Sequence, residues 1–239
     1  MLFHQDTMYH HITVEDTGPW RELKFDRSSQ SGILKADPLR SMYAYTDGFH
    51  LAPIYRPGLK RALFIGAGAA TGPKQFRAFY PDVQVDVAEI DPAVVSVARR
   101  FFSFRPDART AVTIDDGRRF LMTTRNQYDA IIVDAYYADS IPFQVTTVEF
   151  MRLLKRRLTP GGVGIFNIIG SMTGHDSQLV RSEYKTILQA FRSCGVFPIL
   201  ETGEQPHSYS ATEIRNVLLV ATDAPLSPTE VQRRERAIK

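Results

Sequence analysis

Residues 60–91 read KRALFIGAGAATGPKQFRAFYPDVQVDVAEID, a pattern that predicts a strand, a glycine turn, a helix and a second strand. The apolar run at residues 62–65 suits a buried parallel strand. Gly66 and Gly68 follow it, where the backbone must turn tightly and approach a ligand without a Cβ in the way. Glu89 ends the second strand about 20 residues later, the spacing that places an acid against two ribose hydroxyls. The stretch therefore predicts a nucleoside pocket.

The glycine turn departs from the strict pattern G-x-G-x-x-G, because Ala70 and Thr71 precede the next glycine, Gly72. A turn that only lets a helix pack on a sheet is the alternative interpretation. The strand, turn, helix and second strand are nevertheless in register with Glu89, and this combination favours nucleoside binding.

Strand and helix patterns alternate after residue 60. Strands are predicted at residues 61–66, 83–88, 110–114, 128–134 and 162–168, and helices at residues 73–80, 92–103, 117–124, 146–158 and 177–193. Five strands with intervening helices predict an α/β fold with a doubly wound parallel sheet. Residues 196–201 and 215–221 predict an antiparallel pair at the sheet edge, and the capping box at residues 227–230 predicts a last helix.

The pattern before residue 60 is different. Residues 12–14 and 21–25 flank a turn and predict a β-hairpin, residues 30–34 predict a further extended segment, and residues 42–49 predict a helix that leads to a linker at 53–58. We therefore expect a small antiparallel β-domain with its linker at residues 1–58 and a nucleoside-binding catalytic domain at residues 59–239.

The composition is that of a soluble globular protein, with 44% apolar and 23% charged residues and no apolar run long enough to span a bilayer. The first residues lack the features of a secretory signal, so we expect a cytoplasmic protein without a membrane partner. Cys194 is the only cysteine and the six histidines show no ligand spacing, so no metal is expected. The net charge of +3 is dispersed, which argues against nucleic acid as a partner.

Seven motifs follow one another along the chain: Y-x-x-I-x-V from Tyr9, D-x-x-x-Q from Asp26, the glycine turn, V-x-E-I-D, D-D-G-R-x-F-L, Y-D-A-I-I-V-D and L-T-P-G-G. This order resembles the polyamine aminopropyltransferases, the spermidine synthase family, over nearly the whole chain. The resemblance implies a Rossmann-like S-adenosylmethionine-dependent methyltransferase sheet with an N-terminal β-domain. It also implies a homodimer in polyamine biosynthesis, which transfers an aminopropyl group from decarboxylated S-adenosylmethionine to a small cationic amine.

Roles for individual residues follow from the resemblance. Asp134 corresponds to the catalytic aspartate, Glu89 to the ribose acid, and Asp116 with Gly117 to the adenine-binding pair. The residues implied for the donor are Gly66, Gly68, Glu89, Ile90, Asp116, Gly117, Asp134 and Ala135. The residues implied for the acceptor are Gln30, Tyr45, Asp47, Tyr136, Tyr137 and Asp139. Other interpretations are a helix cap for Asp116, a loop cap for Asp134 and a packing role for the two tyrosines.

The chain also departs from the family pattern. Ala69 stands where relatives carry the acid for the amine of the aminopropyl arm, and Tyr137 where they carry a second loop aspartate; Asp139 comes two residues later. Thr46 replaces a histidine, and His10 replaces a glutamine. We interpret His10 as a surface or sheet residue. These departures place the chain in a divergent spermidine synthase-like branch.

The departures matter because aminopropyl transfer is an in-line displacement at a carbon beside a sulfonium. The acceptor amine must be deprotonated and aimed, and carboxylates serve both purposes. Two alternatives therefore stay open: a methyltransferase that uses intact S-adenosylmethionine, and a catalytically silent nucleoside-binding homologue.

Overall fold

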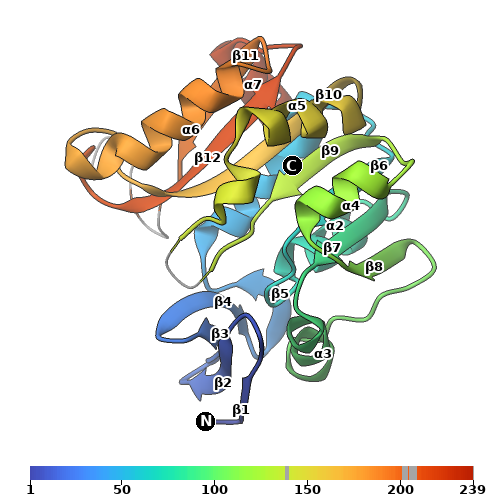
Figure 1. Cartoon of the computed structure of the whole chain (residues 1–239), viewed down its shortest axis with the longest axis vertical. Coiled ribbons are helices and arrows are strands. Elements are labelled where there is room, and N and C mark those ends of the chain that lie inside the picture. Colours follow the sequence, from blue (N-terminus) through green and yellow to red (C-terminus); the bar gives the residue numbers. More distant parts are fainter. Residues whose placement is uncertain (138–139, 201–203, 205–208, 239) are drawn as a thin grey trace.

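A computed structural model describes residues 1–137, 140–200, 204 and 209–238. Two sheets make up the molecule, and Figure 1 shows the first, in dark blue, below the second. The first is an antiparallel meander in the order β1-β2-β3-β4-β5. Its strands are β1 (Phe3–Asp6), β2 (His11–Thr17), β3 (Trp20–Phe25), β4 (Ser28–Leu34) and β5 (Asp37–Ser41).

The second sheet has the order β11-β12-β10-β9-β6-β7-β8. Its strands are β6 (Arg61–Ile65), β7 (Gln84–Glu89), β8 (Thr110–Ile114), β9 (Tyr128–Val133), β10 (Leu158–Gly170), β11 (Ser193–Pro198) and β12 (Arg215–Thr222). Strands β6 to β10 are parallel, whereas β12 runs antiparallel to both β10 and β11. The predicted parallel sheet with an antiparallel edge pair is confirmed.

Helices cover both faces of this sheet, because side chains along each strand alternate between two cores. Phe64 faces one core, with Phe76 of α2 (Thr71–Phe79), whereas Leu63 faces the other, with Phe150 of α5 (Val148–Arg157). The remaining helices are η1 (Ala44–His50), α1 (Leu51–Tyr55), α3 (Pro92–Phe101), α4 (Gly117–Thr123), η2 (Phe143–Val145), η3 (His175–Ser177), α6 (Gln178–Leu188) and α7 (Pro228–Ile238). The doubly wound architecture is therefore confirmed.

The small sheet packs against the first of these cores, to which β2, β3 and β4 contribute Ile12, Leu23 and Ile33. Lys74 of α2 links the two parts, since its ammonium group donates to the carbonyl oxygens of Pro38 at 2.8 Å and Phe102 at 2.7 Å. The β-domain therefore shares buried surface with the α/β part and is not a detached appendage.

Several element boundaries differ from the predictions. Strands β1 and β5 were not predicted, since each lies at an edge of the small sheet and β5 contains Pro38, which a strand tolerates only at such an edge. Helix α1 occupies the start of the expected linker, and β11 begins three residues earlier than expected. Among the described residues, no helix is long and apolar enough to cross a membrane.

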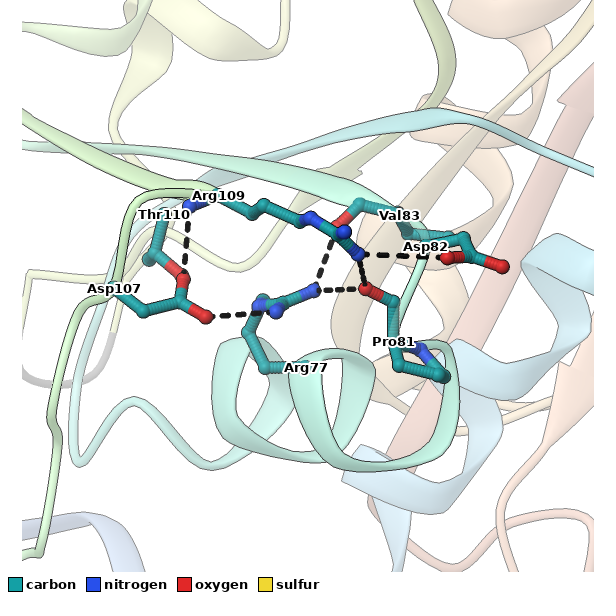
Figure 2. A network of polar contacts seen from close by, with 7 residues as sticks. All are labelled: Arg77, Pro81, Asp82, Val83, Asp107, Arg109 and Thr110. Carbon is teal, nitrogen blue, oxygen red and sulfur yellow. Dashed lines mark hydrogen bonds and ion pairs between the residues drawn. The ribbon is translucent and has the colours of Figure 1, made fainter.

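A network at the amino ends of β7 and β8 joins neighbouring loops (Figure 2). Arg77 donates to the carbonyl oxygens of Pro81 and Val83 at 3.0 and 2.9 Å, and to the carboxylate of Asp107 at 2.7 Å. Its hydrogen bond holds the pKa of Asp107 at about 2. Ligands of open α/β sheets bind at the carboxyl ends of the strands, whereas this network lies at the amino ends. We therefore interpret it as a structural network and not as part of a binding site.

Candidate active site

A cavity of about 400 Å³ lies at the carboxyl ends of β6, β7, β9 and β10 and is faced by β4 of the small sheet. Of the predicted site residues that the structure describes, all except Asp47 line it: Gly66, Gly68, Glu89, Ile90, Asp116, Gly117, Asp134, Ala135, Gln30, Tyr45, Tyr136 and Tyr137. The structure thus brings together residues from both halves of the chain.

The glycine turn is closely packed, which explains its composition. Gly66 has a φ of 96°, and a Cβ there would lie 2.1 Å from the carbonyl oxygen of Asp134. A Cβ on Gly68, whose φ is 49°, would lie 2.5 Å from the hydroxyl oxygen of Ser31. Only glycine lets the turn touch both the end of β9 and strand β4.

Glu89 is buried at the end of β7 and accepts two backbone hydrogen bonds. Oε2 accepts from the Ala67 amide at 2.7 Å and Oε1 from the Asp91 amide at 2.9 Å. Burial raises the pKa of Glu89 to about 6, although these two bonds oppose the rise. Each carboxylate oxygen has two lone pairs, so both oxygens can still accept from a diol.

Asp116 has a structural role as well as a place in the cavity. Its Oδ1 accepts from the Arg119 amide at 2.9 Å and so caps α4, as the alternative interpretation expected. Gly117 follows it against β6, where a Cβ would lie 2.3 Å from Ile65 Cγ2. Capping therefore fixes the Asp116 carboxylate at the cavity wall, which Gly117 also lines.

Asp134 follows the wholly buried strand β9 and is itself surrounded by polar groups. Its Oδ1 accepts from Nδ2 of Asn167 at 2.8 Å, and the Oδ1 of Asn167 accepts from Nδ2 of Asn216 at 2.9 Å. Burial raises the pKa of Asp134 to about 6, against the opposing hydrogen bonds of Asn167 and Tyr45. A carboxylate with this pKa is ionised at neutral pH and can take up a proton.

The segment after β9 covers the cavity. The hydroxyl of Tyr136 donates to the backbone carbonyl of Asn167 at 2.9 Å, and that of Tyr137 accepts from Gln144 at 3.3 Å. Arg118 of α4 holds the far end of the segment, because it donates to the Gln144 carbonyl at 3.1 Å and the Thr147 hydroxyl at 3.2 Å. Both tyrosines thus have packing partners as well as a place in the cavity wall.

One described residue falls elsewhere. Asp47 is exposed on η1, accepts a hydrogen bond from Gln75 at 3.3 Å and does not line the cavity, so its role beside the acceptor stays a prediction. Tyr45 faces the cavity from the same element, and residues two apart on a 3₁₀-helix point in different directions. Asp139 lies outside the described residues.

Sequence reasoning missed several cavity residues. His10, expected at the surface or in the sheet, is only 6% exposed and stacks on Phe25 with ring centroids 3.9 Å apart. Burial lowers its pKa, and its Nδ1 is buried without a hydrogen-bond partner. The other missed residues that line the cavity include Ser28, Ser29, Ser31, Tyr43, Asn167 and Asn216. Asn167 could have been noticed as a polar residue inside an apolar strand.

Ala69 stands at the position where the family pattern has an acid. Ala69 is buried, and its amide donates to the hydroxyl of Ser31 at 3.1 Å. Neutral groups therefore occupy this corner of the turn. Within the described part of the chain, no group of three or more histidine, cysteine or acidic side chains could hold a metal ion.

Comparisons with known proteins agree with this arrangement. A probable polyamine aminopropyl transferase of Bifidobacterium longum is 34% identical over 139 residues, covering 58% of this chain and 30% of that protein. A polyamine aminopropyltransferase of Vibrio vulnificus is 28% identical over 194 residues, covering 77% and 65%. The chain therefore spans less than two thirds of the length of these curated relatives.

Solved structures show the same fold. A probable spermidine synthase from Corynebacterium glutamicum has a TM-score of 0.82 at 22% identity, covering 99% of this chain and 86% of that one. Human methyltransferase-like protein 13, in complex with SAH, has a TM-score of 0.66 at 24% identity, covering 82% and 90%. The spermine/spermidine synthase domain matches residues 47–200, more than half of the sequence, and the chain belongs to this family.

Proposed function

We propose that the protein is a spermidine synthase-like transferase that moves an aminopropyl group from decarboxylated S-adenosylmethionine to a di- or polyamine. The observation that carries the proposal is the position of Asp134, half-buried in the cavity directly after β9 and packed against the glycine turn. Family membership and the names of the relatives support the same reaction class.

In this proposal the two halves of the cavity have separate tasks. Glu89 accepts from the ribose hydroxyls, and Asp116 with Gly117 holds the adenine, while Gly66, Gly68, Ile90 and Ala135 contact the donor through the backbone. Gln30, Tyr45, Tyr136 and Tyr137 surround the acceptor amine. Residues 1–58 then supply one wall of a site whose other wall belongs to residues 59–239.

Asp134 acts on the acceptor amine. An ammonium group cannot attack carbon, so one amine proton passes to the carboxylate before or during the displacement. The free nitrogen lone pair then forms the new C–N bond as the C–S bond breaks, and the thioether leaves with the electron pair. Burial raises the pKa of Asp134 to about 6, which makes it basic enough to accept a proton yet leaves it ionised at neutral pH.

One observation favours a second candidate, a methyltransferase that uses intact S-adenosylmethionine. Ala69 and Ser31 form a neutral corner where the family pattern has an acid for the amine of the aminopropyl arm. Without that acid, the cavity loses an electrostatic attraction for the cationic aminopropyl arm. The other cavity residues then determine whether the decarboxylated or the intact sulfonium compound binds.

Calorimetry and product analysis separate the two functions. We expect the decarboxylated donor to bind more tightly than the intact one, because the carboxylate of the intact donor approaches Asp134, and we expect product with putrescine or spermidine. Methylation of an acceptor by the intact donor, with no product from any polyamine and the decarboxylated donor, would refute the aminopropyl proposal. We also propose a cytoplasmic homodimer, which light scattering at micromolar concentration would test.

A further inference from the structure

Three polar side chains form a row across one face of the larger sheet. Asn216 of β12 donates to Asn167 of β10 at 2.9 Å, and Asn167 donates to Asp134 at the end of β9 at 2.8 Å. All three residues line the cavity, and Asn167 is only 4% exposed. The row connects β12, the second strand from the sheet edge, by two hydrogen bonds to the carboxylate that the proposed reaction uses.

The strand register fixes this row. Asn167 pairs with Leu218 across β10 and β12, so Asn216, two residues away, is its diagonal neighbour on the same face. Phe166 pairs with Val133 across β10 and β9, which places Asn167 next to Asp134. The row therefore depends on ladder hydrogen bonds and not on a loop conformation.

The orientation of the Asn167 amide determines whether a hydrogen-bond donor or an acceptor faces the Asp134 carboxylate. A side-chain amide has donor hydrogens on one side and an acceptor oxygen on the other. With Nδ2 toward Asp134, the amide stabilises the carboxylate anion; reversed, its oxygen faces the carboxylate and favours the protonated acid. In the observed arrangement Nδ2 of Asn216 donates to the amide oxygen of Asn167, which leaves Nδ2 of Asn167 directed at Asp134.

We propose that Asn216 is a positioning residue that holds the Asn167 amide with its N–H toward Asp134 and so keeps this carboxylate ionised and oriented. Only the catalytic consequence rests on the proposed function. The electrostatic effect depends solely on the described hydrogen bonds.

The other groups that face Asp134 do not titrate near neutral pH. They are Tyr45 of η1 and Tyr136 of the segment after β9, and burial raises the pKa of each well above 10. Glu89 is a further carboxyl group of the cavity, with a pKa of about 6. A measurement must therefore resolve Asp134 from Glu89.

Carbon-13 NMR of the aspartate carboxyl groups meets this need in the full chain without ligands, since glutamate is unlabelled and Asp134→Asn identifies the Asp134 signal. We expect the titration midpoint of Asp134 to rise by about one pH unit in Asn216→Asp and by a smaller amount in Asn216→Leu. Each change removes the donor to Asn167, and only the first also adds a charge. Leucine is apolar and of similar size, so this variant decides the question if the aspartate variant does not fold.

Asn126→Asp is the matched control. Asn126 also donates to a carboxylate, that of Asp86 at 3.3 Å, but neither residue lines the cavity. We expect the titration midpoint of Asp134 in this variant to equal that in the wild type. An unchanged midpoint in both folded Asn216 variants would overturn the proposal.

The pH dependence of kcat/KM for putrescine with decarboxylated S-adenosylmethionine tests the catalytic consequence, because kcat/KM reports the pKa values of the enzyme before the acceptor binds. The acid limb should move with the NMR midpoint in each variant. A moved midpoint with a stationary acid limb would refute the role in catalysis. If no acceptor turns over at all, the proposed function fails, while the NMR titration still decides the role of Asn216.

Discussion

At the scale of single residues, the cavity contains two carboxyl groups whose pKa values burial raises alike but whose hydrogen-bond partners differ. Burial raises the pKa of both Glu89 and Asp134 to about 6. Glu89 accepts from two backbone amides, whereas Asp134 accepts from side chains that belong to other strands and elements. Glu89 is therefore held by backbone amides of its own turn and of the glycine turn, whereas Asp134 depends on side chains for its orientation.

Replacing Asp134 by asparagine tests its proposed role. Asparagine keeps the shape of the side chain but removes the charge and the basicity, so kcat should fall by about 10²–10⁴ while the donor affinity changes little. In the wild type, kcat should decline as the pH falls below about 6, where Asp134 becomes protonated. Steady-state kinetics and calorimetry measure both quantities.

Asp47→Asn is the matched control, because Asp47 is the site residue that the sequence predicted and the structure places on the exposed side of η1. We expect its kcat to stay within about twofold of the wild type. Equal losses in the two variants would contradict the placement of Asp47, and full activity of Asp134→Asn would contradict the role of Asp134.

Glu183 of α6 makes the free energy of unfolding depend on pH. It is 4% exposed, and burial raises its pKa from 4.5 to about 7. Between these values the unfolded chain loses the proton while the folded chain keeps it, so the free energy of unfolding falls as the pH rises from about 4.5 to about 7. Glu183→Gln should therefore be about 2–3 kcal/mol more stable than the wild type at pH 8 and similar to it at pH 4.5.

Urea denaturation at the two pH values measures this difference. Glu235→Gln, on the exposed side of α7, is the control and should change neither value. A gain in Glu183→Gln that is the same at both pH values would show that the carboxyl group does not titrate on unfolding.

At the scale of elements, the sequence predicted features that depend on neighbouring residues. The glycine turn is an example, because Gly66 and Gly68 follow an apolar strand and Glu89 ends the next one. His10 and Asn216 could not be assigned in this way, since their cavity positions depend on contacts with residues far along the chain. The exposure of Asp47 could not be predicted, because a motif match does not give the direction of a side chain on a 3₁₀-helix.

The network of Arg77 supports a prediction about how elements are joined (Figure 2). In Arg77→Ala the Val83 carbonyl loses its side-chain donor, the Pro81 carbonyl keeps only that of Arg109, and Asp107 loses its ion pair. We expect the free energy of unfolding to fall by about 1–3 kcal/mol. Donor affinity should not change, because the network lies at the edge of the sheet opposite the cavity.

Arg109→Ala is the control within the same network. Arg109 is more exposed than Arg77 and forms its ion pair with the exposed Asp82 at 3.5 Å. Its loss should cost less than about 1 kcal/mol in urea denaturation. Equal costs for the two variants would mean that the contacts of Arg77 with Val83 and Asp107 add nothing beyond the Pro81 contact, which Arg109 also makes.

At the scale of the whole molecule, the small sheet and the α/β part share one hydrophobic core and several polar contacts. Thr7 donates to Asp91 at 2.6 Å, and the amide of Ala69 donates to Ser31 at 3.1 Å, so both contacts join the sheet to loops that border the cavity. A site built from two sheets requires that they stay together. We therefore expect the chain to unfold as one cooperative unit.

Lys74→Met tests this expectation. Lys74 is 8% exposed, and its ammonium group satisfies the carbonyl groups of Pro38 in the small sheet and Phe102 after α3. Methionine fills similar space but leaves both carbonyls without this donor, so the free energy of unfolding should fall by about 1–3 kcal/mol.

Trp20, the single tryptophan, reports on the small sheet by fluorescence, and far-UV circular dichroism reports on the helices. In one cooperative unit both urea transitions move together, and the exposed Lys35→Met variant moves neither. An earlier transition of Trp20 alone, with the helices unchanged, would show that the β-domain unfolds independently and that the shared core does not couple the two walls of the site.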